Sequence, residues 1–175
     1  MGCLIGKGSI SGFDQRVRAG LTKRSFFNHF TDKREVLFAD AQAFEAGIIA
    51  HLAEAGDDLS AIDAAISALT RGGLDLAQYG AYALGRRELI ASSPELQERN
   101  LIKMASLTAA VAAALRARHA PAMTAAFAAQ AAVAVFNAAY DEWADDTTAD
   151  FAALMQQSLS DLRHATCQAD ATTAT

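Results

Sequence analysis

Apolar residues recur at helical spacing along most of this 175-residue chain. One stripe follows steps of three, four or seven through Leu59, Ile62, Ile66, Leu69 and Leu76, which places its members on one face of a helix. Only two prolines interrupt the sequence, and alanine, the best helix former, is abundant. Because β-branched residues never gather into strand-like runs, the sequence predicts an all-α fold.

Cap and turn residues predict where these helices begin and end. Asp32 and Glu35 form a capping box for a long helix that runs to about Ala55. Ser60 is expected to cap the next helix, and the pair Gly72-Gly73 to kink it. Four further helices are predicted. The first covers residues 79–91, the second starts at Pro94, and the third runs from Pro121 to about Trp143. The last follows a cap formed by Thr147 and Asp150.

Charge is distributed unevenly along the chain. Residues 1–40 carry seven basic and four acidic side chains, a net charge of +3, whereas the whole chain carries −5. Residues 41–175 therefore carry −8. A basic segment on an acidic body favours a polyanion-binding end, and an ordinary solvated surface is the alternative.

Several functional classes find no support in the sequence. Cys3 and Cys167 lie near opposite ends, and the four histidines lack the spacing of metal ligands. No nucleophile elbow or acid–base pair stands out, and no apolar run reaches membrane-spanning length. We therefore expect a cytoplasmic protein that is not an enzyme and has no metal, no cofactor and no membrane partner.

The segment over residues 20–37 combines a glycine turn with two capped helices. On its short helix, Phe26 and Phe30 are spaced i, i+4 and are expected to anchor the helix inward. Basic and amide side chains, among them Arg24 and Asn28, lie on the remaining surface. Arginine pairs bidentately with guanine and asparagine with adenine, so this helix suits the major groove of DNA. A basic helical hairpin without a DNA role is the alternative.

This run, GLTKRSFFNHFTDKREVL, resembles the helix-turn-helix signature of TetR-family transcriptional regulators. The shared pattern is a glycine turn, a Thr or Ser cap, an aromatic residue, a His-Phe pair and a lysine that opens the next helix. Phe27 stands where the family usually has tyrosine. The resemblance implies that Arg24 and Asn28 read bases. The full set of residues implied to contact DNA is Thr22, Lys23, Arg24, Ser25, Phe27, Asn28, His29 and Lys33.

The resemblance also implies the domain organisation and the function. A DNA-binding domain over residues 1–39 would precede a helical ligand-binding and dimerisation domain over residues 40–175. Such a regulator, expected to be a repressor, binds double-stranded operator DNA as a homodimer and is released by a small-molecule effector. In the family the last two helices form the dimer interface, which here implies Phe127, Ala131, Val135, Tyr140, Phe151, Leu154, Met155 and Leu159.

A hydrophobic effector is expected in the helical body. Aromatic and sulfur-containing side chains from different helices could line its cavity, namely Phe44, Tyr79, Tyr82, Met104 and Phe136. Plain packing of these side chains in a core is the alternative.

The sequence departs from the family before Gly20. Family members have two complete helices there, whereas the nineteen residues that precede Gly20 are rich in glycine over the first twelve. Without a complete first helix, Phe26 and Phe30 lose packing surface, and burying one such ring stabilises a domain by roughly 1.5–3 kcal/mol. We therefore expect weak DNA binding or none. The alternative function is a dimeric ligand-binding protein of the same fold with impaired DNA binding.

Overall fold

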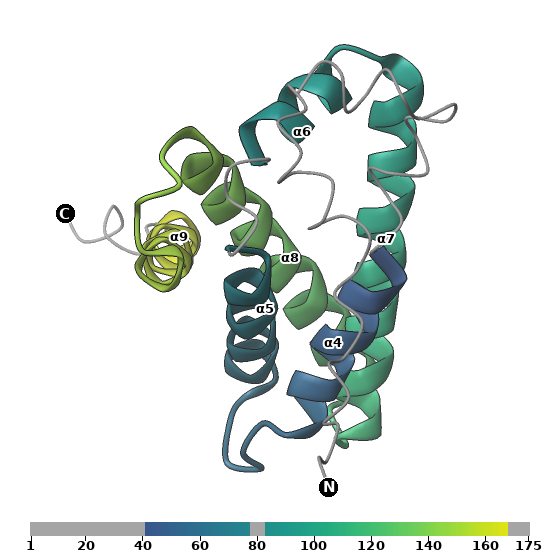
Figure 1. The fold of residues 1–175 in the computed structure, drawn as a ribbon. Helices are drawn as coiled ribbons and strands as arrows, with labels where there is room; N and C mark the ends of the chain where they lie inside the picture. The colour runs from purple at the N-terminus through teal and green to yellow at the C-terminus, as the bar shows by residue number, and fades with distance from the viewer. Residues whose placement is uncertain (1–40, 78–82, 168–175) are drawn as a thin grey trace, which may run out of the picture. The chain divides into compact units, whose positions relative to one another are not determined.

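The computed structural model describes residues 41–77 and 83–167. Within these ranges every regular element is a helix (Figure 1), which confirms the predicted all-α fold. The helices are α4 (Ala41–Ala53), α5 (Ala61–Ala77), α6 (Ala83–Ala91), α7 (Pro94–Ala117), α8 (Ala122–Asp145) and α9 (Phe151–Cys167). The segment that resembles a helix-turn-helix lies outside the described residues.

Helix α8 is the centre of the bundle. It packs against α5, α7 and α9 and also contacts α6 (Figure 1). Several of its alanines, including Ala125, Ala129 and Ala132, have no exposed surface, and their small side chains let the neighbouring helices approach closely. By length and composition α8 is apolar enough to cross a membrane, but here its apolar character serves the core of a helical bundle.

The predicted apolar stripes face this core. Phe44 and Met104 are half-buried at the edge of the stripes, whereas Leu59 precedes α5 and is largely exposed. The buried members are Ile48 and Leu52 on α4, Ile66 and Leu69 on α5, Leu107, Val111 and Leu115 on α7, and Phe151, Met155 and Leu159 on α9.

The helix starts follow the predicted caps. The Ser60 hydroxyl accepts a hydrogen bond from the Asp63 amide at 3.3 Å and donates one to the Asp63 carboxylate at 2.6 Å. Asp150 caps α9 by accepting from the Ala152 amide at 2.9 Å. Helix α7 begins at Pro94 as predicted, although Ser93 makes no side-chain cap bond there.

The pair Gly72-Gly73 plays a different role from the expected kink. Helix α5 runs through both residues without a break. A Cβ at Gly72 would lie well under 3.0 Å from the Ile48 side chain, and one at Gly73 equally close to the Phe151 ring. The two glycines therefore let α5 approach α4 on one side and α9 on the other.

Replacing Gly73 with alanine is expected to destabilise the protein. Helix propensity favours alanine by about 1 kcal/mol, but the overlap with the buried Phe151 ring outweighs this gain and leaves a net loss of roughly 1–2 kcal/mol. Gly47→Ala is the matched control, because no atom lies within 4 Å of a Cβ there, and it should gain about 0.5–1 kcal/mol. Urea unfolding measures both changes, and a more stable Gly73→Ala variant would contradict the packing role.

Arg118 joins the end of α7 to the end of α4. Its guanidinium donates from Nη1 to the carbonyls of Leu52 at 3.2 Å and Ala55 at 2.9 Å, and from Nη2 to that of Gly56 at 2.7 Å. These carbonyls lie at and just after the C-terminal end of α4, where a positive charge is favourable. The Leu52 and Gly56 carbonyls also accept from the amides of Ala55 and Leu59, each at 3.3 Å. The following residue, His119, has a positive φ of 68° that turns the chain toward α8.

Arg118→Ala should lower the free energy of unfolding by about 1–3 kcal/mol, because three carbonyls lose a charged donor. Hydrogen exchange of the amides at the C-terminal end of α4 should accelerate in the same variant. Arg116→Ala, an exposed arginine one residue before the end of α7, is the control and should change stability by no more than about 0.5 kcal/mol. Equal effects of the two substitutions would show that Arg118 does not hold α4.

Candidate functional site

The residues expected to contact DNA cannot be placed in the fold. Thr22, Lys23, Arg24, Ser25, Phe27, Asn28, His29 and Lys33 all lie outside the described residues, as do Tyr79 and Tyr82 of the expected effector cavity. The structure describes helices α4 to α9, so the candidate site is built from these helices.

An aromatic cluster centred on Phe136 of α8 joins this helix to α4 and α9. The Phe136 ring centroid lies 5.8 Å from that of Phe44, 6.1 Å from that of Tyr140 and 5.9 Å from that of Phe151. Trp143 extends the cluster, with its ring edge-to-face against Phe151 at 6.0 Å. Edge-to-face and tilted ring pairs at these distances contribute stabilising free energy in addition to that of the apolar area they bury. The cluster therefore stabilises the packing of α4 and α9 on α8.

Three of the residues expected to line an effector cavity pack in one core, and neither of the two hollows described below is lined by them. Phe44 and Phe136 are in contact across α4 and α8, and Met104 of α7 packs against the same core. Phe136 is almost completely buried, and Phe44 and Met104 are half-buried. A molecule that reaches Phe136 from the Phe44 side would therefore touch α4 and α8 at once.

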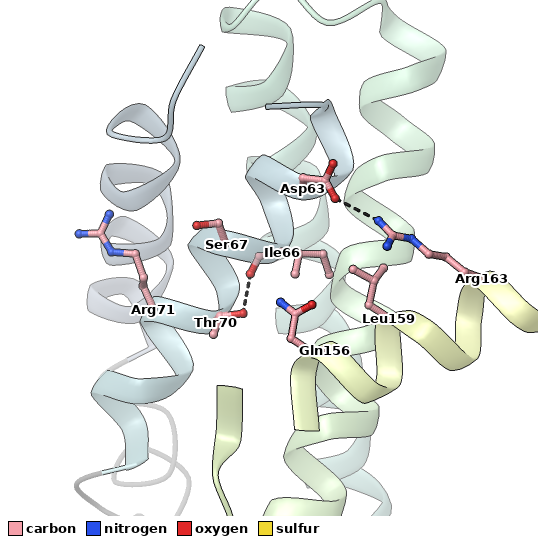
Figure 2. Close-up of a pocket in the computed structure, with 8 residues that line it drawn as sticks. All are labelled: Asp63, Ile66, Ser67, Thr70, Arg71, Gln156, Leu159 and Arg163. Atoms are coloured by element: carbon pink, nitrogen blue, oxygen red, sulfur yellow. Dashed lines mark hydrogen bonds and ion pairs between the residues drawn. The ribbon is translucent and has the colours of Figure 1, made fainter. Parts of the chain in front are cut away.

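A hollow of about 280 Å³ lies between α5 and α9 (Figure 2). Ile66 and Leu159 give it an apolar surface, and Ser67, Thr70 and Gln156 add polar groups. Its two arginines already have carboxylate partners: Arg163 donates to Asp63 at 3.1 Å, and Arg71 to Glu54 at 2.9 Å. Because both guanidinium groups are paired, this hollow offers no uncompensated charge to an anionic ligand.

A second hollow, of about 460 Å³, lies between α7 and α8. Its walls carry methyl groups, one hydroxyl and one amide, and its lining residues are Ala105, Thr108, Ala109, Ala112, Ala126 and Gln130. The hydroxyl of Thr108 donates to the Met104 carbonyl of its own helix at 2.8 Å. This hollow is therefore an apolar surface with few groups that would orient a polar ligand.

An ion pair ties α6 to the end of α8. Arg87 donates to the Asp141 carbonyl at 2.7 Å and pairs with the Asp145 carboxylate. The hydrogen bond from Arg87 lowers the pKa of Asp145 below its usual range, so the pair persists at neutral pH and is lost only in acid. Helix α6 buries only Ala83 and Gly85, and it also packs against α7, where Arg86 donates to the Asn100 side chain at 3.4 Å.

The residues expected in the dimer interface differ in how much of each side chain is exposed in the single chain. Four of them lie inside the core of the single chain, namely Val135, Phe151, Met155 and Leu159. These four hold α8 and α9 to the rest of the same protomer. Ala131, Tyr140 and Leu154 are half-buried. Phe127 is 63% exposed, so among these residues it offers the largest apolar surface to a partner chain.

The described residues contain no group of three histidine, cysteine or carboxylate side chains that could hold a metal ion. Within the same ranges, Arg71 and Arg163 form ion pairs with Glu54 and Asp63 on the surface. What the body provides is thus an aromatic core, two hollows and an exposed phenyl ring.

Comparison with known protein families identifies this body. Residues 59–166 match the family model TetR_C_14, the MftR C-terminal domain, over more than half of the chain and from the start of α5 to the last turn of α9. No curated protein matches the chain. The matched family is one of regulators and not of enzymes. The chain therefore belongs to the TetR family, and its described helices carry the C-terminal domain of a TetR-family regulator.

Proposed function

We propose that this protein is a transcriptional repressor that binds operator DNA as a homodimer in the cytoplasm and releases it when a small hydrophobic effector binds. One observation carries the proposal. The TetR-family C-terminal domain at residues 59–166 follows, in the same chain, the run GLTKRSFFNHFTDKREVL that resembles the DNA-binding signature of that family. The two signals come from separate parts of the sequence and indicate the same kind of protein.

The DNA-binding part of the proposal is assigned to residues 20–37. Arg24 and Asn28 would read base edges, and Lys33 would bind phosphate at the start of the following helix. Thr22, Lys23, Ser25, Phe27 and His29 would hold this reading helix against the DNA backbone.

The effector part of the proposal is assigned to the contact between α4 and α8. The rings of Phe44 and Phe136 are 5.8 Å apart, and α4 is the helix that leads from the DNA-binding segment in the sequence. Arg118 fixes the other end of α4 through the carbonyls of Leu52, Ala55 and Gly56. A ligand that separates Phe44 from Phe136 would tilt α4 about this fixed end and favour a conformation that does not fit the operator.

A homodimer would present two reading helices to successive major grooves, about one helical turn apart. Exposed Phe127 supports a partner surface that includes α8. The alternative function is a dimeric ligand-binding protein with impaired DNA binding, which is favoured by the four glycines among residues 1–12. Ligand-dependent thermal stabilisation without binding to any duplex would identify that alternative.

Operator binding should depend steeply on salt. The test uses the full chain and duplexes selected from a random-sequence library at low salt. Lys33→Ala should weaken binding to all selected sequences and reduce the slope of log K against log salt by about 0.9, because one phosphate contact is lost. Arg163→Ala, an exposed arginine of the C-terminal domain, is the control and should leave the slope unchanged. Failure to enrich any duplex would reject the repressor in favour of the ligand-binding protein.

Arg24→Ala should change specificity rather than salt dependence. Loss of a bidentate contact to guanine should remove about 1–3 kcal/mol of discrimination at one base pair. Affinities for the selected operator and for its single-base variants measure this effect. An unchanged preference at every position would exclude Arg24 as a base reader, even if the protein still binds DNA.

A further inference from the structure

The basic side chains of the helical body are unevenly distributed. Residues 41–175 carry eight arginine and lysine side chains against sixteen acidic ones. Four of the eight pair with carboxylates or bind backbone carbonyls as described above, namely Arg71, Arg87, Arg118 and Arg163. Three of the others gather where α6 packs against α7, and we call them the α6–α7 basic cluster: Arg86, Arg99 and Lys103.

The cluster is built from both helices around one amide side chain. Helices α6 and α7 are joined by a short turn and pack against each other (Figure 1). From α6, Arg86 donates to the side-chain oxygen of Asn100 at 3.4 Å. On α7, Arg99 directly precedes Asn100 and lies one helical turn before Lys103. Arg86 and Lys103 are half-buried, so their charges are screened less than those of fully exposed side chains.

Three like charges in one place have an electrostatic cost. Partial burial lowers the pKa of the Lys103 ammonium group, and the positive charges of Arg86 and Arg99 lower it further. Side chains whose pKa is shifted by burial together with specific neighbouring charges cluster at functional sites. An anion among the three side chains would offset their mutual repulsion and accept charge-assisted hydrogen bonds from them.

The cluster adjoins the apolar side of α7. Asn100 precedes Met104 by four residues and Leu107 by seven, so the three side chains lie on one side of the helix. Leu107 is buried in the core, and Met104, one of the residues expected to line the effector cavity, packs against this core. Positive charge therefore lies at one end of an apolar stripe.

We infer that the α6–α7 basic cluster binds an anionic group, a carboxylate or a phosphate, which the effector carries at the end of an apolar body. The inference rests on the effector-released repressor of the proposed function and names the chemical class of its effector. The two guanidinium groups can each donate two N–H groups to one anion, and Lys103 adds a compact positive charge. The hollow between α5 and α9 lacks this chemistry, because its arginines already pair with carboxylates.

Isothermal titration calorimetry of the full chain at fixed ionic strength tests the cluster with octanoate, octyl phosphate and the uncharged octan-1-ol. Wild type should bind one of the two anions about tenfold or more tightly than octan-1-ol. Lys103→Gln removes the charge and should raise the dissociation constant of that anion by about tenfold, without changing that of octan-1-ol. Arg116→Gln, at an exposed arginine near the other end of α7, is the matched control and should bind like wild type.

Arg99→Gln provides a second variant, because Arg99 is exposed and its replacement should leave the fold intact. It should weaken binding of the same anion by about threefold or more. Circular dichroism checks that all variants retain the helical content of wild type.

The outcomes separate the inference from the function on which it rests. Anion binding that Lys103→Gln and Arg99→Gln weaken and Arg116→Gln does not supports the cluster, and the tighter anion decides between carboxylate and phosphate. No preference of wild type for either anion over octan-1-ol, or equal affinities in wild type and both cluster variants, overturns it. Release of a selected duplex by octan-1-ol would then still support the hydrophobic effector of the proposed function. An anion that binds at the cluster and leaves a selected duplex bound overturns the assignment to the effector.

Discussion

The close approach of α5 to its neighbours is the constraint on which the packing of the described helices depends. Gly72 and Gly73 leave no side chain between α5 and the buried Ile48 and Phe151. With α5 in this position, Phe151 reaches Phe136 and Trp143, and the aromatic cluster closes between α4, α8 and α9. The buried alanines of α8 also allow close packing with α5, α7 and α9. Helices with small side chains at their contacts pack at short axial distances.

The cluster and the Arg118 contacts hold two different parts of α4, the helix that follows the segment proposed to bind DNA. Phe44 meets Phe136 on one turn of α4, and Arg118 holds the carbonyls at its C-terminal end. One contact is apolar and can be separated by an apolar molecule, whereas the other is made of directional hydrogen bonds to backbone. An apolar ligand would therefore act on the Phe44 contact and leave the hydrogen bonds of Arg118 in place, as the proposed release mechanism requires.

Much of the fold was predictable from sequence, since the helix starts at Ser60, Pro94 and Asp150 follow local rules and the apolar stripes follow helical spacing. The role of Gly72-Gly73 was not, because local propensity predicts a kink and cannot show that Phe151, far along the chain, lies against the glycine. Arg118 was missed because its acceptors are backbone carbonyls more than sixty residues away. Val135 and Met155, which were expected in the dimer interface, lie in the core of the single chain, because an apolar stripe alone does not show which neighbour covers it.

The weak attachment of α6 has a consequence for access to the interior. Apart from Ala83 and Gly85, its side chains remain outside the core, and its most specific tie to α8 is the pair between Arg87 and Asp145. Regions with few buried apolar contacts open at lower free-energy cost than the whole domain. We therefore expect local opening of α6 to cost less free energy than opening of any of the five longer described helices.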